Sequence, residues 1–159
     1  MIIDTARLTL EPIGAELAHR ILARDEQPGD AWHPDYPFVD ELDPLRSLAD
    51  AGTPASDFGM YLLRRTSDGL AIGGFGFFGP PDDTGTVEFG YGLIPSARGA
   101  GLATEAVIAG LIFAGTKGAR RAIADTEIAN GPSRNVLVKA GLRETRRDGA
   151  TVFFERDLV

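Results

Sequence analysis

The stretch from residue 86 to residue 128 limits the possible folds of this chain more than any other. It opens with TVEFGYGLIP, in which apolar residues recur with the period of a β-strand. The glycine-containing segment SARGAGLATEA leads into an apolar run, which predicts a helix at 101–117 that is buried on more than one side. A second strand pattern, RRAIADTEI, ends the stretch. The order strand, helix, strand predicts a β-α-β unit.

The remaining residues predict an α/β fold with strands and helices on either side of this unit. A proline-rich, acidic segment without clear periodicity follows the first predicted helix. Asp148-Gly149 favours a type I′ hairpin turn near the end of the chain. A length of 159 residues with 43% hydrophobic content predicts a single domain over residues 1–159. The other predicted elements are strands at 6–13, 58–65 and 70–79, helices or helical turns at 15–24 and 45–52, and a short helix from Asn130-Gly131-Pro132 to Gly141.

Composition excludes several classes of function. The chain has no cysteine, which rules out disulfides, a thiol nucleophile and a cysteine-ligated metal. Its longest strongly apolar run, AVIAGLIFAG, is about half of the ~20 residues that a membrane span needs. A formal net charge of −7 disfavours nucleic acid and favours neutral or cationic partners. With no secretory signal pattern at the start, we expect a cytoplasmic protein that binds neither nucleic acid nor membrane.

A glycine loop that opens a helix can bind an anion through free backbone N–H groups. The loop at 96–106 lacks the Gly-Lys-Ser/Thr of a Walker motif. Gly99-x-Gly101 partly fits a dinucleotide fingerprint, with Asp125 at about the right distance, but Thr104 stands at the third glycine position. Too few residues follow Asp125 to complete a doubly wound sheet. The third candidate for an anion-binding motif in this loop is the pattern Arg98-x-x-Gly101-x-Ala103.

This pattern resembles the R/Q-x-x-G-x-G/A signature with which the GNAT N-acetyltransferases wrap the pyrophosphate of acetyl-CoA. The flanking VEFGYGLIPSARGAGLATEA, and a second block from Asn130-x-x-Ser133 to Gly141-Leu142, are similar to the RimJ/RimL-like branch, which acetylates protein N-termini and related amines. The resemblance covers essentially the whole chain. It implies the GNAT acyl-CoA N-acyltransferase fold, with a mixed, mostly antiparallel sheet of about seven strands flanked by four helices. Homodimers are common in the resembled family.

The resemblance also implies acetyl-CoA as cosubstrate and no metal. It implies a bulge in the strand at 86–95 that opens a V-shaped slot for the pantetheine arm. Spare N–H groups near Leu93 would then bind the thioester oxygen. The residues expected to bind the cosubstrate are Leu93, Ile94, Arg98, Gly99, Ala100, Gly101, Leu102, Ala103, Thr104, Asn130 and Asn135.

Two residues are candidates for moving protons. Period two places Glu88 on the same face of its strand as Gly90 and Gly92, so Glu88 is the candidate general base. Four residues of strand separate Glu88 from Gly92 by roughly 13 Å, which requires a water relay. Many GNAT enzymes protonate the leaving thiolate with a tyrosine, but Leu137 aligns there, and Ser133 on the same helix is the candidate substitute.

The acidic segment after the first helix is the candidate acceptor site. Its aromatic residues, Trp32, Tyr36 and Phe38, stand among aspartates and are expected to attract and cover a cationic amine. A surface loop anchored in the core by these aromatics is the alternative. The predicted activity is direct acetyl transfer to a primary amine, either a protein N-terminal α-amine or a small molecule, in a ternary complex. A catalytically silent acyl-CoA-binding module and a nicotinamide-dependent reductase are the alternative functions.

Overall fold

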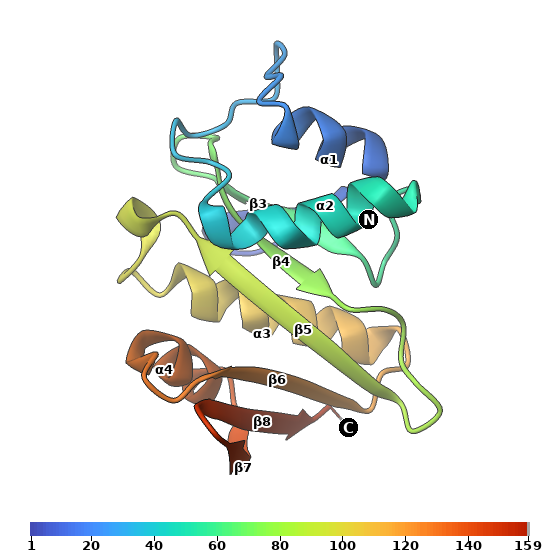
Figure 1. Ribbon diagram of the computed structural model, residues 1–159, viewed down its shortest axis with the longest axis vertical. Helices are drawn as coiled ribbons and strands as arrows, with labels where there is room; N and C mark the ends of the chain where they lie inside the picture. The colour runs from blue at the N-terminus through green and yellow to red at the C-terminus, as the bar shows by residue number, and fades with distance from the viewer. Residues whose placement is uncertain (159) are drawn as a thin grey trace.

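A computed structural model of the protein describes residues 1–158, which form an eight-stranded sheet with helices on both faces (Figure 1). The strand order is β1-β2-β3-β4-β5-β6-β8-β7, and only β5 and β6 run parallel. This confirms the mixed, mostly antiparallel sheet and the four helices; a two-residue first strand makes eight strands instead of about seven. The strands are Ile3–Asp4 (β1), Leu8–Ile13 (β2), Met60–Arg65 (β3), Ala71–Phe77 (β4), Thr86–Leu93 (β5), Arg121–Glu127 (β6), Arg143–Asp148 (β7) and Thr151–Asp157 (β8).

The helices divide between the two faces of the sheet. In Figure 1, α1 and α2 lie in front of the sheet, α3 passes behind it, and α4 lies beside β6. The prediction that α3 is buried on more than one side was wrong: its buried residues lie on one half of the helix, and Ile112 on the other half is 61% exposed. On the buried side, Gly110 brings the helix backbone against the ring of Phe75 in β4. The helices are Ala15–Leu22 (α1), Leu42–Ala51 (α2), Leu102–Thr116 (α3) and Gly131–Lys139 (α4), with 3-10 turns at Val39–Glu41 (η1) and Pro95–Ala97 (η2).

The parallel strands β5 and β6 separate soon after they begin. They pair only over Thr86–Glu88 and Arg121–Ile123. Beyond this point β5 continues its pairing with β4, while β6 continues with β8. Figure 1 shows the two strands diverging toward the side where α3 begins and α4 lies. The β-α-β unit is therefore confirmed, and its strands open like a V.

The expected bulge in β5 is absent. The register between β4 and β5 is continuous from Phe77 opposite Phe89 to Gly73 opposite Leu93. No extra residue is needed to separate β5 from β6, because each strand has a different partner once the short parallel ladder ends. The divergence of β5 and β6 is thus a consequence of sheet topology, and the prediction of a bulge was wrong.

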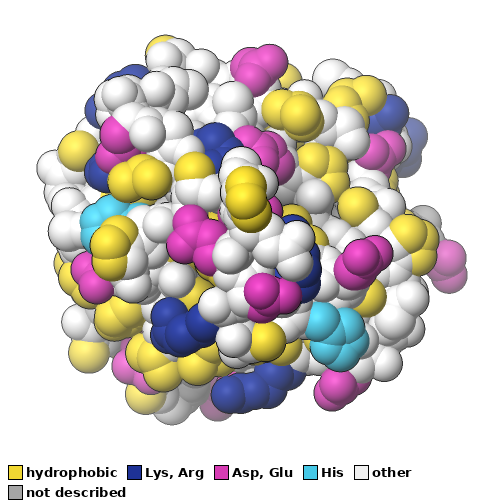
Figure 2. Space-filling model, turned by 90° about the horizontal axis from the view of Figure 1, so that it is seen from above, with side chains coloured by type: hydrophobic (Ala, Val, Ile, Leu, Met, Phe, Trp, Pro, Cys, Tyr) yellow, Lys and Arg dark blue, Asp and Glu magenta, His cyan; other side chains and the backbone are white. Residues whose placement is uncertain are grey.

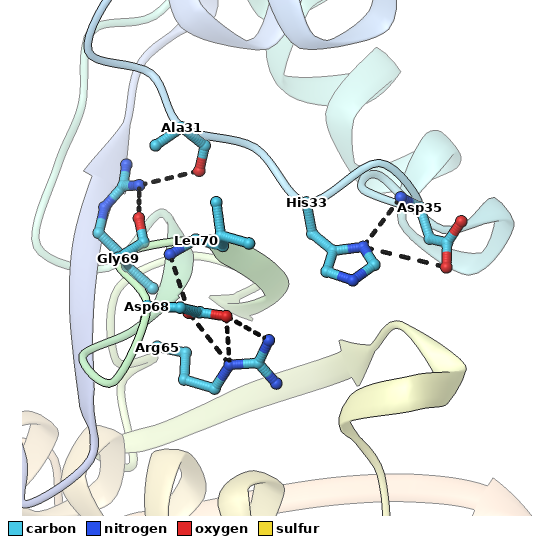
Figure 3. Close-up of polar contacts among 8 residues, drawn as sticks. Ala31, His33, Asp35, Arg65, Asp68, Gly69 and Leu70 are labelled. Atoms are coloured by element: carbon cyan, nitrogen blue, oxygen red, sulfur yellow. Dashed lines mark hydrogen bonds and ion pairs between the residues drawn. The ribbon is translucent and has the colours of Figure 1, made fainter.

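The acidic segment between α1 and α2 is held firmly against the β3–β4 hairpin. One guanidinium, that of Arg64, donates to the carbonyls of both Ala31 and Gly69 (Figure 3). The Ala71 N–H also donates to the Ala31 carbonyl, and Trp32 forms a β-bridge with Ala71. These bonds provide partners for the main-chain N–H and C=O groups of an irregular segment, and they fix where η1 lies over the sheet.

The hairpin between β7 and β8 is confirmed, but its turn type is not. Asp148 pairs with Thr151, so the two turn residues are Gly149 and Ala150. Type I′ needs a positive φ at both turn residues, whereas only Gly149 has one, at 59°. Asp148 belongs to the strand ladder, which shifts the turn by one residue from its predicted position.

Candidate active site

The glycine loop joins the end of β5 to the start of α3 and is shaped to expose main-chain N–H groups. Gly99 and Gly101 have φ of 85° and 82°, a conformation that other residues rarely adopt. Gly101 is the N-cap of α3, and no side chain caps the helix. The first N–H groups of α3 and the positive end of its dipole are therefore available to an anion. The predicted residues from Arg98 to Thr104 thus meet at one helix start.

Arg7, which the sequence did not single out, braces this loop from the start of β2. Its guanidinium donates to the Ala100 carbonyl at 2.8 Å and to Glu105 Oε1 at 2.9 Å. Glu105 also accepts from the Arg7 main-chain N–H and from the hydroxyl of Thr5. Burial alone would raise the pKa of Glu105. These hydrogen bonds outweigh the effect of burial and lower the pKa below its usual value, so the carboxylate stays charged. Contacts almost a hundred residues apart in sequence leave no local signal, which is why Arg7 was missed.

Arg98 points back toward the end of β5. Its Nε donates to the Leu93 carbonyl at 3.1 Å, and its guanidinium lies 5.1 Å from the centre of the Phe38 ring. Arg98 thus links the glycine loop to the segment before η1. A role in binding pyrophosphate stays a prediction for this residue.

The slot between β5 and β6 is lined by main-chain groups of β5. The Glu88 carbonyl accepts a hydrogen bond from the N–H of Phe78, the residue after β4. The Ile94 N–H donates to the carbonyl of Ile72 in β4. Because hydrogen-bonding groups alternate sides along a strand, the N–H groups of Tyr91 and Leu93 point toward β6. The strands are no longer paired at this level. The structure therefore directs N–H donors into the slot without a bulge.

Tyr91 of β5 and Ser133 of α4 are in contact. The Tyr91 hydroxyl lies 2.8 Å from Ser133 Oγ at the start of α4. Asn130 is the N-cap of α4, and its side chain accepts from the Ser133 N–H at 3.1 Å. Burial raises the pKa of Tyr91, while the hydrogen bond with Ser133 lowers it. Leu137 is buried in the core. The structure thus brings a tyrosine of β5 into contact with the first turn of α4.

Glu88 lies where the two parallel strands separate. It is the last residue of β5 that pairs with β6, and its side chain is exposed. Partial burial and the negative charge of Asp125 on β6 raise its pKa. Its position is compatible with a base that works through water, because roughly 13 Å of strand still separates it from Gly92.

The predicted acceptor-binding aromatics lie mostly in the core. Trp32 is 8% exposed and Tyr36 is 2% exposed, as expected for anchors of the segment. Phe38 is half-buried beneath Arg98. On the face seen in Figure 2, acidic side chains are spread among Lys and Arg and do not form one patch. Of the three aromatics, Phe38 alone keeps the partial exposure that contact with an acceptor needs.

Within residues 1–158, no group of three or more His, Asp or Glu side chains is arranged to hold a metal ion. Over the same range, every helix is too short or too polar to span a bilayer.

Asn135 is exposed on α4, where its predicted contact with the cosubstrate stays a prediction.

Comparison with known proteins identifies the fold. The sequence profile described as "Acetyltransferase (GNAT) domain" matches residues 7–143. None of the curated proteins compared matches the sequence. A GNAT-family acetyltransferase from Bacillus anthracis superposes with a TM-score of 0.71 at 18% identity, covering 99% of both chains. The ribosomal-protein-S5-alanine acetyltransferase of Vibrio fischeri gives 0.65 at 14% identity, covering 99% of this chain and 96% of that one.

A third structure was solved with a CoA derivative. RimJ of Mycobacterium smegmatis in complex with CoA-disulfide superposes with a TM-score of 0.61 at 23% identity, covering 94% of this chain and 81% of that one. At these identities the structures share the fold, whereas the profile covers most of the sequence. The chain belongs to the GNAT family of acetyl-CoA-dependent acetyltransferases.

Proposed function

We propose that this protein transfers the acetyl group of acetyl-CoA directly to a primary amine while both substrates are bound. The divergence of β5 and β6 beside the uncapped start of α3 carries this proposal. The loop provides N–H donors for the pyrophosphate, and the slot leads from it to the main-chain donors of β5. Gly90 and Gly92 of β5 carry no side chains, so Phe78 and Asp40 can lie directly over them on the face where we place the acceptor.

The acceptor that we propose is a protein N-terminal α-amine or a small-molecule amine. The ribosomal-protein acetyltransferase and RimJ among the proteins of the same fold support the first choice. The two motif blocks that resemble the RimJ/RimL-like branch support it independently. An association of two copies, as in the resembled family, is compatible with this activity.

Direct transfer requires two proton movements. The amine must lose a proton before it can attack the thioester carbon, and the CoA thiolate must gain one as the C–S bond breaks. Glu88 would accept the first proton through water. The Tyr91 and Ser133 hydroxyls share a hydrogen bond, so either one can pass a proton to the sulfur and be resupplied by the other.

We expect Ser133→Ala and Tyr91→Phe each to lower kcat by on the order of 100-fold, the lower end of what acid catalysis contributes. Both variants delete a hydroxyl with little change in shape. Because the two groups act together, the double variant should lose much less than the product of the single losses. Steady-state rates of thiol release measure this. Ser47→Ala on the exposed side of α2 is the matched control. Unchanged kcat in both single variants would remove this pair from the mechanism.

The proposed function is tested by measuring thiol release from acetyl-CoA across a panel of amines. The panel contains a peptide with an N-terminal alanine, spermidine, an aminoglycoside and a free amino acid. Release of CoA with an equal amount of acetylated amine supports the proposal. Tight binding of acetyl-CoA without release on any amine would favour the silent module. Calorimetric binding of NADPH in place of acetyl-CoA would favour the reductase.

Glu88→Gln tests the proposed base in the same assay. Loss of a general base that acts through water is expected to lower kcat by on the order of 100-fold at neutral pH. Affinity for acetyl-CoA should not change, because Glu88 is distant from the glycine loop. A variant with the full rate would exclude Glu88 as the base and leave the family assignment intact.

A further inference from the structure

Two neighbouring glycines of the sheet carry carboxylates above them. Gly74 of β4 pairs directly with Gly92 of β5. A Cβ atom at Gly74 would overlap Oε1 of Glu41, and a Cβ atom at Gly92 would lie 2.8 Å from Oδ2 of Asp40. Any larger residue at either position would displace these carboxylates. We call Asp40, Glu41 and the two glycines the acid cradle.

Glu41 is buried without a partner. It is 4% exposed, and neither of its carboxyl oxygens has a hydrogen-bond partner among residues 1–158. A buried polar group left unpaired destabilises the fold, and native structures retain few of them. Asp40 precedes Glu41 in the same 3-10 turn; the residue as a whole is exposed, but its carboxylate lies over Gly92. The acid cradle therefore contains two carboxylate oxygens, those of Glu41, that accept no hydrogen bond from residues 1–158.

The spacing of the acid cradle suits a primary ammonium. Paired Cα atoms of neighbouring antiparallel strands lie about 4.5–5.5 Å apart, so the carboxylates of Glu41 and Asp40 approach neighbouring positions of the sheet. An ammonium nitrogen placed between them can donate to both at about 2.8 Å. The acid cradle thus fits the charged form of an amine.

Few other charged or titratable groups face the acid cradle. The positive charge of Arg98 lowers the pKa of Asp40 against the larger effect of its burial, which raises it. The hydroxyl of Tyr36 lies in the electrostatic field of Glu41 and is itself buried without a partner. The field at that hydroxyl also includes Arg64 and Glu11, which form an ion pair with each other.

The acid cradle lies closer to the expected position of the thioester than Glu88 does. Gly92 immediately precedes Leu93, whose N–H points into the slot. Glu88 is roughly 13 Å away along the same strand. A group that removes a proton from the attacking nitrogen must lie within hydrogen-bond reach of it or act through one water. Glu41 and Asp40 satisfy this requirement more directly than Glu88.

We propose that the acid cradle binds the ammonium group of the acceptor and that Glu41, instead of Glu88, takes its proton. The Glu88→Gln variant should then keep the wild-type rate. This inference rests on the proposed function. One proton passes from the ammonium to the Glu41 carboxylate, and the neutral nitrogen forms a bond to the thioester carbon. The C–S bond then breaks, and the second proton lost by the nitrogen goes to the CoA sulfur. Glu41 returns its proton to solvent, so the net products are the acetylated amine, CoA with a free thiol, and one proton.

The ionisation of Glu41 supports this role. Burial and the charge of Asp40 raise the pKa of Glu41 from 4.5 to about 8. Its proton affinity is then close to that of an amine, which favours exchange between them. Since the folded pKa is raised, the folded state keeps a proton that the unfolded chain loses above pH 4.5. Stability from this group is therefore present in full below pH 4.5 and decreases as the pH rises to about 8.

The test compares Glu41→Gln and Asp40→Asn with Asp43→Asn in the amine assay. Asp43 is a matched control because its substitution removes the same charge nearby while its side chain is 94% exposed. We expect Glu41→Gln to lower kcat by on the order of 100-fold. We expect Asp40→Asn to raise KM for the amine by about 10-fold, the effect of one lost charged contact. Affinity for acetyl-CoA and the behaviour of Asp43→Asn should remain at wild-type values. Normal kcat in Glu41→Gln together with normal KM in Asp40→Asn would overturn the proposal, although acetyl transfer itself would stand.

A binding measurement separates this inference from the proposed function. Ligand-observed NMR on the CoA-saturated protein, where no transfer occurs, reports binding of each amine of the panel. At least one amine should bind the wild type at pH 8.5, above the pKa of about 8 at which Glu41 becomes charged, and bind both cradle variants about 10-fold more weakly. Equal binding to all variants, or no binding to the wild type, would overturn the inference even if the wild type transfers acetyl groups. Denaturation of Glu41→Gln from pH 5 to pH 9 should lack the wild-type decrease in stability.

Discussion

Gly101→Val is expected to weaken binding of acetyl-CoA by on the order of 100-fold. Gly101 has a φ of 82°, which a β-branched residue adopts only with strain. The substitution would turn the first N–H groups of α3 away from the pyrophosphate. Each charge-assisted hydrogen bond is worth about 1.5–3 kcal/mol, so losing one or two accounts for this factor. Isothermal titration with acetyl-CoA measures it.

Gly118→Val is the matched control at the other end of α3. Gly118 also has a positive φ, 97°, and nothing lies within 4 Å of the place where its Cβ would be. The two variants therefore share the backbone strain but not the position. Gly118→Val should lower the melting temperature and leave the affinity for acetyl-CoA unchanged. Equal losses of affinity in both variants would mean that the loop acts only through stability.

Gly110→Ala is expected to lower the free energy of unfolding by about 1–2 kcal/mol, although alanine favours helices. The added methyl would lie 2.5 Å from the Phe75 ring, which is 1% exposed. That ring is stacked on Phe89 and meets Phe77 edge to face, so it cannot turn aside. Overpacking of this kind costs about 1–3 kcal/mol, more than the ~1 kcal/mol gained from helix propensity.

Gly115→Ala makes the same substitution one and a half turns later in α3. There the nearest atom to the added methyl is the Leu158 carbonyl oxygen at 3.6 Å, an ordinary contact. This variant should gain up to about 1 kcal/mol. Urea denaturation of the two variants measures the difference. A stable Gly110→Ala would mean that α3 does not approach the sheet as closely as described.

The sequence predicted the elements whose periodicity is local. The strand at 86–95 and the apolar helix after it were expected within two residues of β5 and α3. The positive φ of Gly99 and Gly101 agrees with a loop that needs glycine. Such features depend on neighbouring residues along the chain, which a single sequence displays directly.

Features set by distant contacts could not be predicted in this way. Glu41 belongs to an acidic, proline-rich segment, and such a run is usually solvated. Only the folding of η1 over the Gly74–Gly92 pair buries its carboxyl. The contact of Tyr91 with Ser133 likewise depends on where α4 lies, which the local pattern of β5 does not show. The expected bulge failed for the same reason, since strand pairing alone opens the slot.

A crystal structure with bound acetyl-CoA tests the central claim most directly. The pyrophosphate should accept hydrogen bonds from the main chain between Arg98 and Ala103, and the thioester should lie between β5 and β6 beside Leu93. The acid cradle should then face the acetyl group from the other side of Gly92. Acetyl-CoA bound elsewhere, with the slot between β5 and β6 closed, would contradict the account.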